Sequence, residues 1–373
     1  MQLAPATDGF APLRVDLGER SYDIHLGPGL LAAAGALIAG AVSPSRAFII
    51  THPAIDRLHG EVLRDGFRSF PFDTILVPAS ERQKSLRRAG LLYDRLLASG
   101  ADRGSAVVAF GGGVIGDLAG FVAATYMRGI SYVQVPTTLL AQVDASVGGK
   151  VAVDHPQAKN LIGAFHQPGI VIADSDALRT LPARDYRAGI AEVVKHAVIL
   201  APDLFTWLQQ NLDALARRDP AAIAHAVRRS CEIKGEVVRQ DERERGLRAI
   251  LNFGHTVGHA VETLAGYRTL RHGEAVSVGM VAAARMAVAM GRFPRSAAAD
   301  IESLLARCRL PVRLPAFSVE AIISTMAADK KAAARVPRFV LLRAIGEVEN
   351  GVEVPEQVVA SVLRDLGARE RRG

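Results

Sequence analysis

Histidine and glutamate residues in the C-terminal half of the chain could together bind a divalent metal. His255 and His259 lie four residues apart in a segment of helical periodicity, His272 follows, and Glu192 precedes Lys195 by three residues in another such segment. A single histidine on an apolar helix is more often a core residue. Three imidazoles and a carboxylate together suit Zn²⁺ or a similar ion, and three protein ligands would leave positions open for a substrate. On spacing alone, His255 and His259 are the expected pair of ligands.

A glycine-rich turn in the N-terminal half predicts a dinucleotide site. The turn Gly111–Asp117 follows the apolar run Ala106–Phe110 and leads into a helical pattern, which is the context in which G-x-G-x-x-G spacing binds a pyrophosphate. The alternative is a tight turn that binds nothing. The acidic ribose contact usual about 20 residues further on is missing from Ser131–Thr138. Glu81, close to Lys84, is a candidate for that contact, although it could be a solvated residue at a helix start.

Basic and amide side chains could clamp an anionic substrate, because lysine and arginine bind phosphate and carboxylate. Each of them alone could equally be a surface charge. All of these residues come after the run Asp144–Gly149: Lys150, Lys159, Asn160, Lys234, Arg248 and the pair Lys330 and Lys331.

Length and composition predict a globular enzyme of two domains, since 373 residues exceed the size of one hydrophobic core. The net charge of +7 is scattered and not interleaved with aromatic residues, so we expect no nucleic-acid partner. The apolar stretch Ala275–Met290 is too short to span a membrane and reads as a buried helix. The two cysteines are far apart in the sequence, which suggests no disulfide framework and favours a reducing compartment. Met1–Arg14 has no basic start followed by an apolar run, as a signal peptide would, so we expect a cytoplasmic protein.

The pattern of apolar residues changes along the chain. From Arg14 to Asp176, short β-branched runs alternate with helical stretches, which predicts an α/β domain over residues 1–181. After Leu181–Pro182 helical periodicity dominates, which predicts a mainly α-helical domain over residues 182–373. The expected strands are Ala47–Thr51, Thr74–Val77, Ala106–Phe110, Tyr132–Val135, Ile170–Ala173 and, in the second domain, only Phe339–Leu342. The expected helices are Gln83–Ser99, Asp117–Thr125, Ala183–Leu200, Pro202–Ala216, Pro220–Asp241, His255–Leu264, Gly273–Met290, Ala297–Arg307, Val319–Lys331 and Pro355–Leu366.

Several separate motifs, in order along the chain, resemble those of the 3-dehydroquinate synthase family. The likeness runs from about Arg14 to Leu366, and the motifs are Gly111–Leu118, Val135–Lys150, Lys159–Phe165, Ala191–Lys195, Leu251–Thr256 and His272–Ala275. The resemblance implies conversion of 3-deoxy-D-arabino-heptulosonate 7-phosphate to 3-dehydroquinate and phosphate, in the shikimate route to aromatic amino acids. The implied steps are transient oxidation by NAD, phosphate elimination, reduction and intramolecular aldol closure.

The resemblance also implies roles for individual residues. Zinc or cobalt would bind Glu192, His255 and His272, so His259 would face the substrate instead. NAD would contact Glu81, Lys84, Gly113, Val114, Ile115, Gly116, Asp117, Thr137, Thr138, Lys150, Lys159, Ala177, Leu178, Arg179 and Thr180. The substrate pocket would contain Asp144, Lys150, Asn160, Lys195, Lys234, Glu244, Arg248, Asn252, His259 and one of Lys330 or Lys331. Arg128 would reach the phosphate site of a neighbouring subunit, which implies a homodimer.

Two residues depart from the family pattern, and three other functions compete with the one that the resemblance implies. Ser80 stands where the family usually has Gly and His52 where Asn is common, so we expect altered contacts at the adenosine end of the cofactor. The rivals are another sugar-phosphate cyclase, of the 2-deoxy-scyllo-inosose or 2-epi-5-epi-valiolone synthase type, a metal-dependent polyol dehydrogenase, and a non-catalytic NAD-binding protein. Arg248 and Lys234 favour a substrate with a carboxylate. The phosphate-binding lysines and Asn160 argue against the dehydrogenase, and the complete metal triad argues against a non-catalytic protein.

Overall fold

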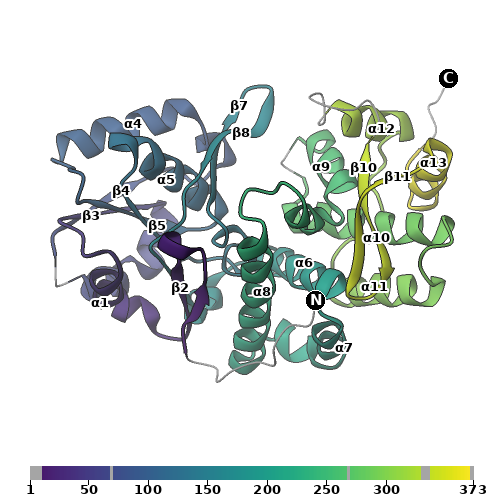
Figure 1. Ribbon diagram of the computed structural model, residues 1–373, viewed down its shortest axis with the longest axis horizontal. Helices are drawn as coiled ribbons and strands as arrows, with labels where there is room; N and C mark the ends of the chain where they lie inside the picture. The colour runs from purple at the N-terminus through teal and green to yellow at the C-terminus, as the bar shows by residue number, and fades with distance from the viewer. Residues whose placement is uncertain (1–10, 68–69, 267–268, 329–336, 370–373) are drawn as a thin grey trace. The chain divides into compact units, whose positions relative to one another are not determined.

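A computed structural model describes residues 11–67, 70–266, 269–328 and 337–369 (Figure 1). By internal contacts the chain divides into two compact units. Of the described residues, those from 11 to Pro182 and Ile223–Arg243 form the first unit, and Ala183–Ala222 and those from Glu244 to 369 form the second. The first contains a mostly parallel sheet and the second is mainly helical, which confirms the predicted fold class.

The first unit is built on a seven-stranded sheet of order β1-β2-β9-β6-β5-β3-β4. All neighbours run parallel except β1 and β2. Strands β3, β5 and β9 are buried along their whole length, as their unbroken apolar runs require in a parallel sheet covered on both faces. The strands are β1 (Leu13–Val15), β2 (Tyr22–Gly27), β3 (Ala47–Thr51), β4 (Phe72–Leu76), β5 (Ala106–Gly111), β6 (Ser131–Pro136) and β9 (Ile170–Asp174).

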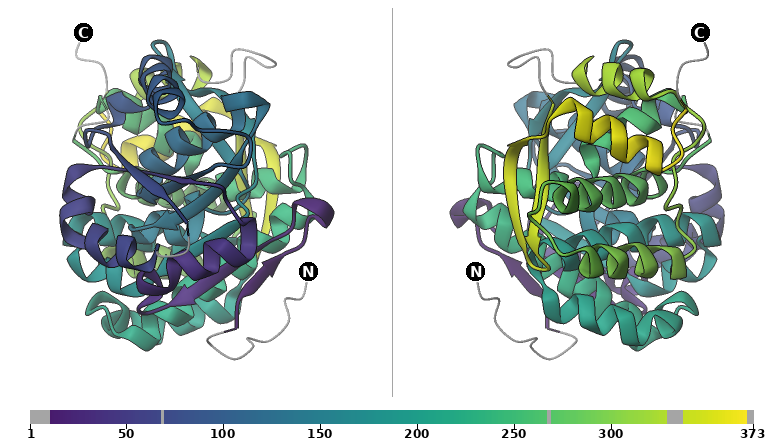
Figure 2. Two further views of the ribbon diagram at one scale, coloured as in Figure 1. Left: turned by 90° about the vertical axis from the view of Figure 1, so that its left-hand side faces the viewer. Right: turned by 90° about the vertical axis from the view of Figure 1, so that its right-hand side faces the viewer.

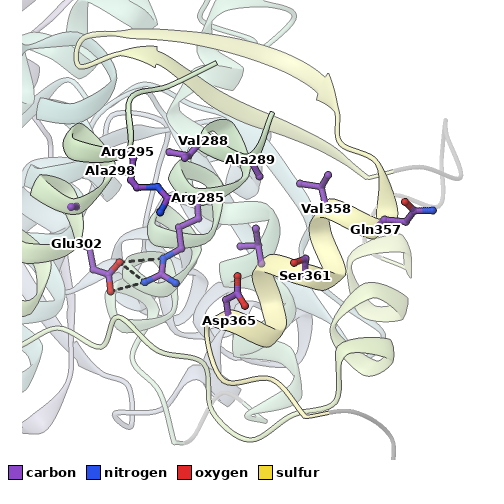
Figure 3. Close-up of a pocket in the computed structure, with 12 residues that line it drawn as sticks. Arg285, Val288, Ala289, Arg295, Ala298, Glu302, Gln357, Val358, Ser361 and Asp365 are labelled. Atoms are coloured by element: carbon purple, nitrogen blue, oxygen red, sulfur yellow. Dashed lines mark hydrogen bonds and ion pairs between the residues drawn. The ribbon is translucent and has the colours of Figure 1, made fainter. Parts of the chain in front are cut away.

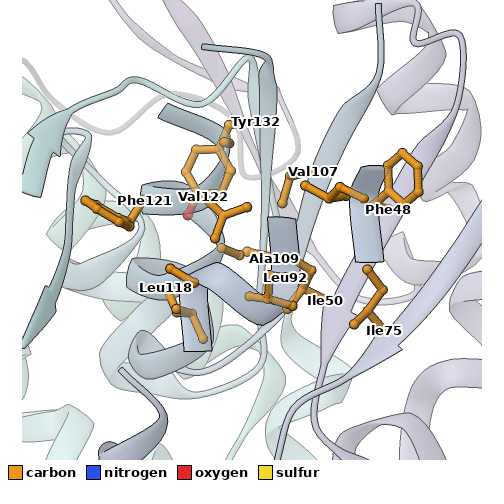
Figure 4. Close-up of a cluster of buried hydrophobic side chains, with 14 of the residues drawn as sticks. Phe48, Ile50, Ile75, Leu92, Val107, Ala109, Leu118, Phe121, Val122 and Tyr132 are labelled. Atoms are coloured by element: carbon orange, nitrogen blue, oxygen red, sulfur yellow. The ribbon is translucent and has the colours of Figure 1, made fainter. Parts of the chain in front are cut away.

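Alternate residues of the central strands supply two separate cores, because successive side chains of a strand point to opposite faces. On one face, Phe48 and Ile50 of β3 pack with residues of α4 (Leu86–Ala98) and α5 (Gly113–Thr125), as Figure 4 shows. On the other, Ala47 and Ile49 pack with α1 (Leu30–Val42) and with Leu63 of α3 (Glu61–Gly66). The sheet is therefore a layer between helices, with every loop displaced to its edges.

Some boundaries and strands differ from the sequence prediction in this unit. Helix α5 begins at Gly113 and not at Asp117, because the glycine turn itself forms the first helical turn. Helix α4 begins at Leu86, where Ser85 Oγ accepts a hydrogen bond from Arg88 N and caps it. Strands β1 and β2 and the hairpin β7 (Lys150–His155) and β8 (Ala158–Phe165) were not predicted.

The second unit is organised around α10 (His272–Ala289), which packs against α6, α9, α11, α13 and β10. The right-hand view of Figure 2 shows the yellow hairpin and α13 beside the green helices α10 and α11. Nearly all of α10 is buried, which confirms the prediction of a buried helix. Among the described residues, no helix is both long and apolar enough to cross a bilayer. The remaining elements are α6 (Ala183–Leu200), α7 (Pro202–Ala216), α9 (His255–Leu264), α11 (Arg295–Arg307), α12 (Val319–Ala328), β10 (Arg338–Ala344), β11 (Glu347–Glu353) and α13 (Glu356–Asp365).

One expectation for the C-terminal half is wrong. Phe339–Leu342 is not a lone strand, because it lies within β10 and pairs antiparallel with β11, whose half-exposed, glutamate-rich sequence carries little apolar signal.

The division by internal contacts is not a single cut in the chain, unlike the predicted domains over residues 1–181 and 182–373. Most of α8 (Pro220–Gln240) belongs to the first unit, where Cys231 Sγ donates to the carbonyl of Gln142 at 3.2 Å and Lys234 pairs with Asp144.

Gly120 on α5 provides a test of this packing. A Cβ there would lie 2.3 Å from Val151 Cγ1 and 2.8 Å from Tyr132 Cζ, both buried. We expect Gly120→Ala to lower the free energy of unfolding by about 2 kcal/mol, because overpacking outweighs the gain in helix propensity. Gly90→Ala on α4 is the matched control, since its Cβ would meet nothing within 4 Å. It should raise stability by about 0.5–1 kcal/mol in the same urea titration. Equal shifts for both variants would contradict the packing described here.

Candidate functional site

The glycine turn of the first unit leaves the start of α5 open to a ligand. Gly111 ends β5, Gly112 is the N-cap residue, and no side chain caps the helix that begins at Gly113. The N–H groups of Gly113, Val114 and Ile115 in the first turn can therefore bind an anion, whereas Gly116 N donates to the carbonyl of Gly112 at 3.0 Å. Such a turn at the carboxyl end of a parallel strand is where dinucleotides bind in this kind of sheet.

The neighbouring strands end in residues that the sequence assigned to the cofactor. Thr137 N donates to the carbonyl of Gly111 at 3.0 Å, and Thr137 Oγ1 is buried with no hydrogen-bond partner among the described residues. Thr138 Oγ1 accepts from Ala141 N. Residues Ala177, Leu178, Arg179 and Thr180 form a short 3₁₀ helix directly after β9. The predicted cofactor residues thus come from the carboxyl ends of adjacent strands.

Charged residues beside the turn form two ion pairs. Lys84 Nζ lies 2.5 Å from Asp117 Oδ2 and also donates to Asn160 Oδ1, while Lys159 Nζ lies 3.0 Å from Glu81 Oε1. Burial raises the pKa of Asp117, and the charge of Lys84 opposes that shift. Five residues from three separate segments of the chain are therefore brought to one region of the first unit.

The second unit brings Glu192, His255 and His272 together as predicted from the family resemblance. One ligand atom from each lies within 4.8 Å of the others. His272 Nε2 is 3.6 Å and His255 Nε2 is 4.0 Å from Glu192 Oε1. The carboxylate comes from α6 and the imidazoles from the starts of α9 and α10.

The two histidines are oriented from behind, which is how metal-binding imidazoles are usually fixed. His255 Nδ1 lies 3.1 Å from the carbonyl of Phe253, and His272 Nδ1 lies 3.1 Å from Glu262 Oε2. Both Nε2 atoms are thereby turned toward Glu192. A carboxylate with two imidazoles held in this way fits Zn²⁺ or Co²⁺.

Glu262 is a site residue that sequence reasoning missed. It is nearly buried, and it lies on α9 seven residues after His255 and three after His259, so the three share one face of the helix. That spacing was a usable signal, because a carboxylate on the face of two histidines is a natural partner for a ligand imidazole.

The two ligand histidines have opposite pKa shifts. Burial, with the nearby charge of Lys195, lowers the pKa of His255 to about 3. Burial acts in the same direction on His272, but the nearby carboxylates of Glu192 and Glu262 outweigh it and raise its pKa to about 10. His255 is therefore neutral and ready to bind a cation, whereas His272 is held by two carboxylates.

His259 is exposed, and its ring centroid lies 5.1 Å from that of His255 and 6.0 Å from that of His272. The group of potential metal ligands consists of Glu192, His255 and His272 and does not include His259. The i, i+4 pair expected from spacing alone is therefore not the arrangement that the structure brings together.

The residues assigned to the substrate fall into two sets, one in each unit. In the second unit, Lys195 Nζ lies 2.5 Å from Glu192 Oε2, Asn252 Nδ2 donates to Glu244 Oε1 at 2.8 Å, and Arg248 is buried. In the first unit, Lys234 Nζ lies 2.7 Å from Asp144 Oδ1. Lys150 and Arg128 are exposed there, at the start of β7 and in the turn after α5. Lys330 and Lys331 lie outside the described residues.

A cavity of about 570 Å³ lies elsewhere in the second unit, between α10, α11 and α13 (Figure 3). Arg285 and Glu302 form an ion pair of 2.6 Å in its wall. None of the residues that line it belongs to the predicted sites.

A doubly covered parallel sheet with a glycine turn, joined to a helical unit with a Glu–His–His group, is the architecture of enzymes that combine a dinucleotide with a divalent metal. Family models narrow this class. The model described as 3-dehydroquinate synthase N-terminal matches residues 74–188, and the one described as 3-dehydroquinate synthase C-terminal matches residues 189–332. The chain belongs to the 3-dehydroquinate synthase family.

Individual relatives agree with this assignment. The chain is 50% identical to a 3-dehydroquinate synthase of Pelotomaculum thermopropionicum over 345 residues, which cover 91% of this chain and 93% of the relative. Its fold is similar to that of a 2-deoxy-scyllo-inosose synthase complexed with carbaglucose-6-phosphate, NAD⁺ and Co²⁺, with a TM-score of 0.87 and 27% identity. The match covers 95% of this chain and 100% of the synthase. It is also similar to the 2-epi-5-epi-valiolone synthase of Streptomyces hygroscopicus subsp. jinggangensis 5008 with NAD⁺ and Zn²⁺ bound, with a TM-score of 0.86 and 29% identity. That match covers 94% of this chain and 98% of the synthase.

The contact between His272 and Glu262 generates a prediction about metal affinity. We expect Glu262→Gln to weaken Zn²⁺ binding about 10- to 100-fold, because an amide stabilises the imidazole less than a carboxylate does. Competition with a chromophoric chelator measures this. Glu320→Gln, an exposed glutamate of the same unit, is the control and should bind Zn²⁺ as the unmodified protein does. Equal affinity for the two variants would show that Glu262 does not support the metal site.

Proposed function

We propose that the chain is a 3-dehydroquinate synthase that converts 3-deoxy-D-arabino-heptulosonate 7-phosphate to 3-dehydroquinate and phosphate, with NAD regenerated in each turnover. The observation that carries this proposal is the Glu192, His255 and His272 group, with both imidazoles held from behind. Family membership and 50% identity to a synthase of that name over most of the chain support it.

The cofactors divide the chemistry with the protein. When bound, NAD would supply a hydride acceptor and donor, and a divalent metal would supply a Lewis acid for a substrate hydroxyl. Gly113–Asp117, Thr137 and Thr138 would hold the NAD, with Glu81, Lys84, Lys159 and Ala177–Thr180 around it. Glu192, His255 and His272 would hold the metal.

Side chains of the second unit would orient the substrate and move protons. Lys195 presents a buried ammonium beside Glu192, which stabilises an oxyanion that develops there. The exposed imidazole of His259, next to the ligand histidines, can give or take a proton. Arg248 supplies a buried guanidinium for a carboxylate, and Asn252 is kept in place by Glu244.

Side chains of the first unit would complete substrate binding. Lys150 and Asn160 are assigned to the phosphate, and Asp144 with Lys234 to the rest of the substrate. Arg128, exposed in a turn, is assigned to the phosphate site of a second copy of the chain, which makes the protein a homodimer in this proposal. Two buried, unpaired cysteines among the described residues are consistent with a cytoplasmic enzyme.

The main rival is another sugar-phosphate cyclase, because two solved structures of similar fold have such names. Identity to them is 27% and 29%, against 50% to the 3-dehydroquinate synthase. Buried Arg248 and Lys234 also favour a substrate with a carboxylate over a sugar phosphate that has none.

The direct test incubates the purified protein with the heptulosonate phosphate, catalytic NAD and Zn²⁺ or Co²⁺. We expect phosphate release and 3-dehydroquinate without accumulation of NADH, and loss of both products when EDTA removes the metal. NADH formed in proportion to substrate would instead indicate a dehydrogenase, and absence of phosphate release would exclude the proposed reaction.

The variant His272→Ala tests the ligand assignment separately. It should lose bound metal and activity while keeping its affinity for NAD, since the glycine turn is on the other unit. Metal content from elemental analysis and NAD affinity from calorimetry give the two readouts. Undiminished metal content would refute His272 as a ligand.

A further inference from the structure

One ammonium group connects a residue assigned to the cofactor with a residue assigned to the substrate. Lys84 is 4% exposed, and its Nζ donates both to Asp117 Oδ2 and to Asn160 Oδ1. Asp117 is the fifth residue of α5, and Asn160 is on β8. Asn160 is exposed and Lys84 is buried, so the buried ammonium holds the amide oxygen from the protein side. A hydrogen bond from a charged donor is stronger than one from a neutral donor, so this contact orients the Asn160 amide.

The same region is held together at the main chain by Asp154, which is near the end of β7. Asp154 N donates to the carbonyl of Lys84 at 2.9 Å, and Asp154 Oδ1 accepts from Asn160 N at 2.9 Å. Asp154 also forms an isolated β-bridge with Ser85. One residue therefore contacts the backbone of both partners in the Lys84–Asn160 hydrogen bond.

Asn160 needs such support because its backbone is in the left-handed region, with φ of 54°. Asparagine tolerates this conformation better than most residues, but it still has to be stabilised by its surroundings. The hairpin β7–β8 that carries Asn160 has register irregularity between Val153 and His155, next to Asp154. Regular strand pairing is interrupted there, and the hydrogen bond from Asn160 N to the Asp154 carboxylate takes its place. Without this bond, nothing in the ladder would hold the Asn160 backbone in its left-handed conformation.

We propose that Asp154 is a positioning residue: its carboxylate fixes the backbone of Asn160 so that Lys84 holds the Asn160 amide ready for the substrate phosphate. This inference rests on the proposed function. It makes substrate binding, and not cofactor binding, dependent on Asp154, because the Lys84 backbone is held by the main-chain N–H of Asp154 and that bond survives any substitution except proline.

The experiment compares Asp154→Ala and Asp154→Asn in the full-length protein. Asp154→Ala should raise the KM for the heptulosonate phosphate about tenfold or more, while the dissociation constant of NAD changes less than about twofold. Asp154→Asn keeps an acceptor oxygen and should remain within about threefold of the unmodified protein in KM. Asp94→Ala, an exposed aspartate on α4, is the matched control and should leave both constants unchanged.

A double-mutant cycle with Asn160→Ala separates positioning from a general effect on folding. If Asp154 acts through the Asn160 amide, adding Asp154→Ala to Asn160→Ala should lower kcat/KM by less than about twofold further. Additive losses, an unchanged KM in Asp154→Ala, or an Asp154→Asn variant as impaired as Asp154→Ala would each overturn the inference. Absence of phosphate release by the unmodified protein would instead overturn the proposed function.

Discussion

A fully buried carboxylate imposes the strictest requirement on the second unit. Glu192 is 0% exposed, and an ionised group in such a place is tolerated only if positive or hydrogen-bonding partners surround it. Lys195 supplies one from the next turn of α6, and His255 and His272 approach from α9 and α10. Close helix packing makes this possible. A Cβ on Gly273 would lie 1.9 Å from the carbonyl oxygen of Ala188, so only glycine lets α10 come near enough to α6 for His272 to reach the carboxylate. Metal binding and helix packing are thus parts of one arrangement.

The first unit solves a different problem, which is how to gather polar groups without placing them inside a core. Its parallel strands are buried on both faces, so polar residues collect where the strands end. The glycine turn after β5, Thr137 after β6 and the 3₁₀ helix after β9 are successive examples. Charges that must be partly buried there are neutralised locally: Lys84 faces Asp117, and Lys159 faces Glu81. The region therefore combines uncapped N–H groups with pre-paired charges, a combination suited to a ligand that carries both phosphates and hydroxyls.

The sequence was most informative where apolar periodicity and end signals agree. The bounds of α6, α7 and α9 were predicted to the residue, with Pro202 marking the first position of α7. It failed for β8 and β11, because their half-exposed residues alternate irregularly and depend on pairing that no local pattern encodes, and for β7, whose buried run is only Val151–Val153. The metal group shows the same limit. Spacing along one helix favoured His259, whereas Glu192 and His272 come from other helices, and only the family resemblance selected them with His255 in place of His259. The supporting role of Glu262 needed the three-dimensional structure.

The place of α8 has a consequence for how the protein is made. Residues 223–243 belong to the first unit, although the chain has already entered the second unit at Ala183. On the ribosome, the sheet of the first unit is complete in sequence well before α8 emerges. Ile233 and Val237 of α8 are fully buried in the finished protein, so the first unit stays without this helix until then. Nascent chains that end before Arg243 should therefore be targets for chaperones. For the same reason, a gene cut at Pro182 would not encode an independent nucleotide-binding fragment, since the missing helix is supplied by a later stretch of messenger.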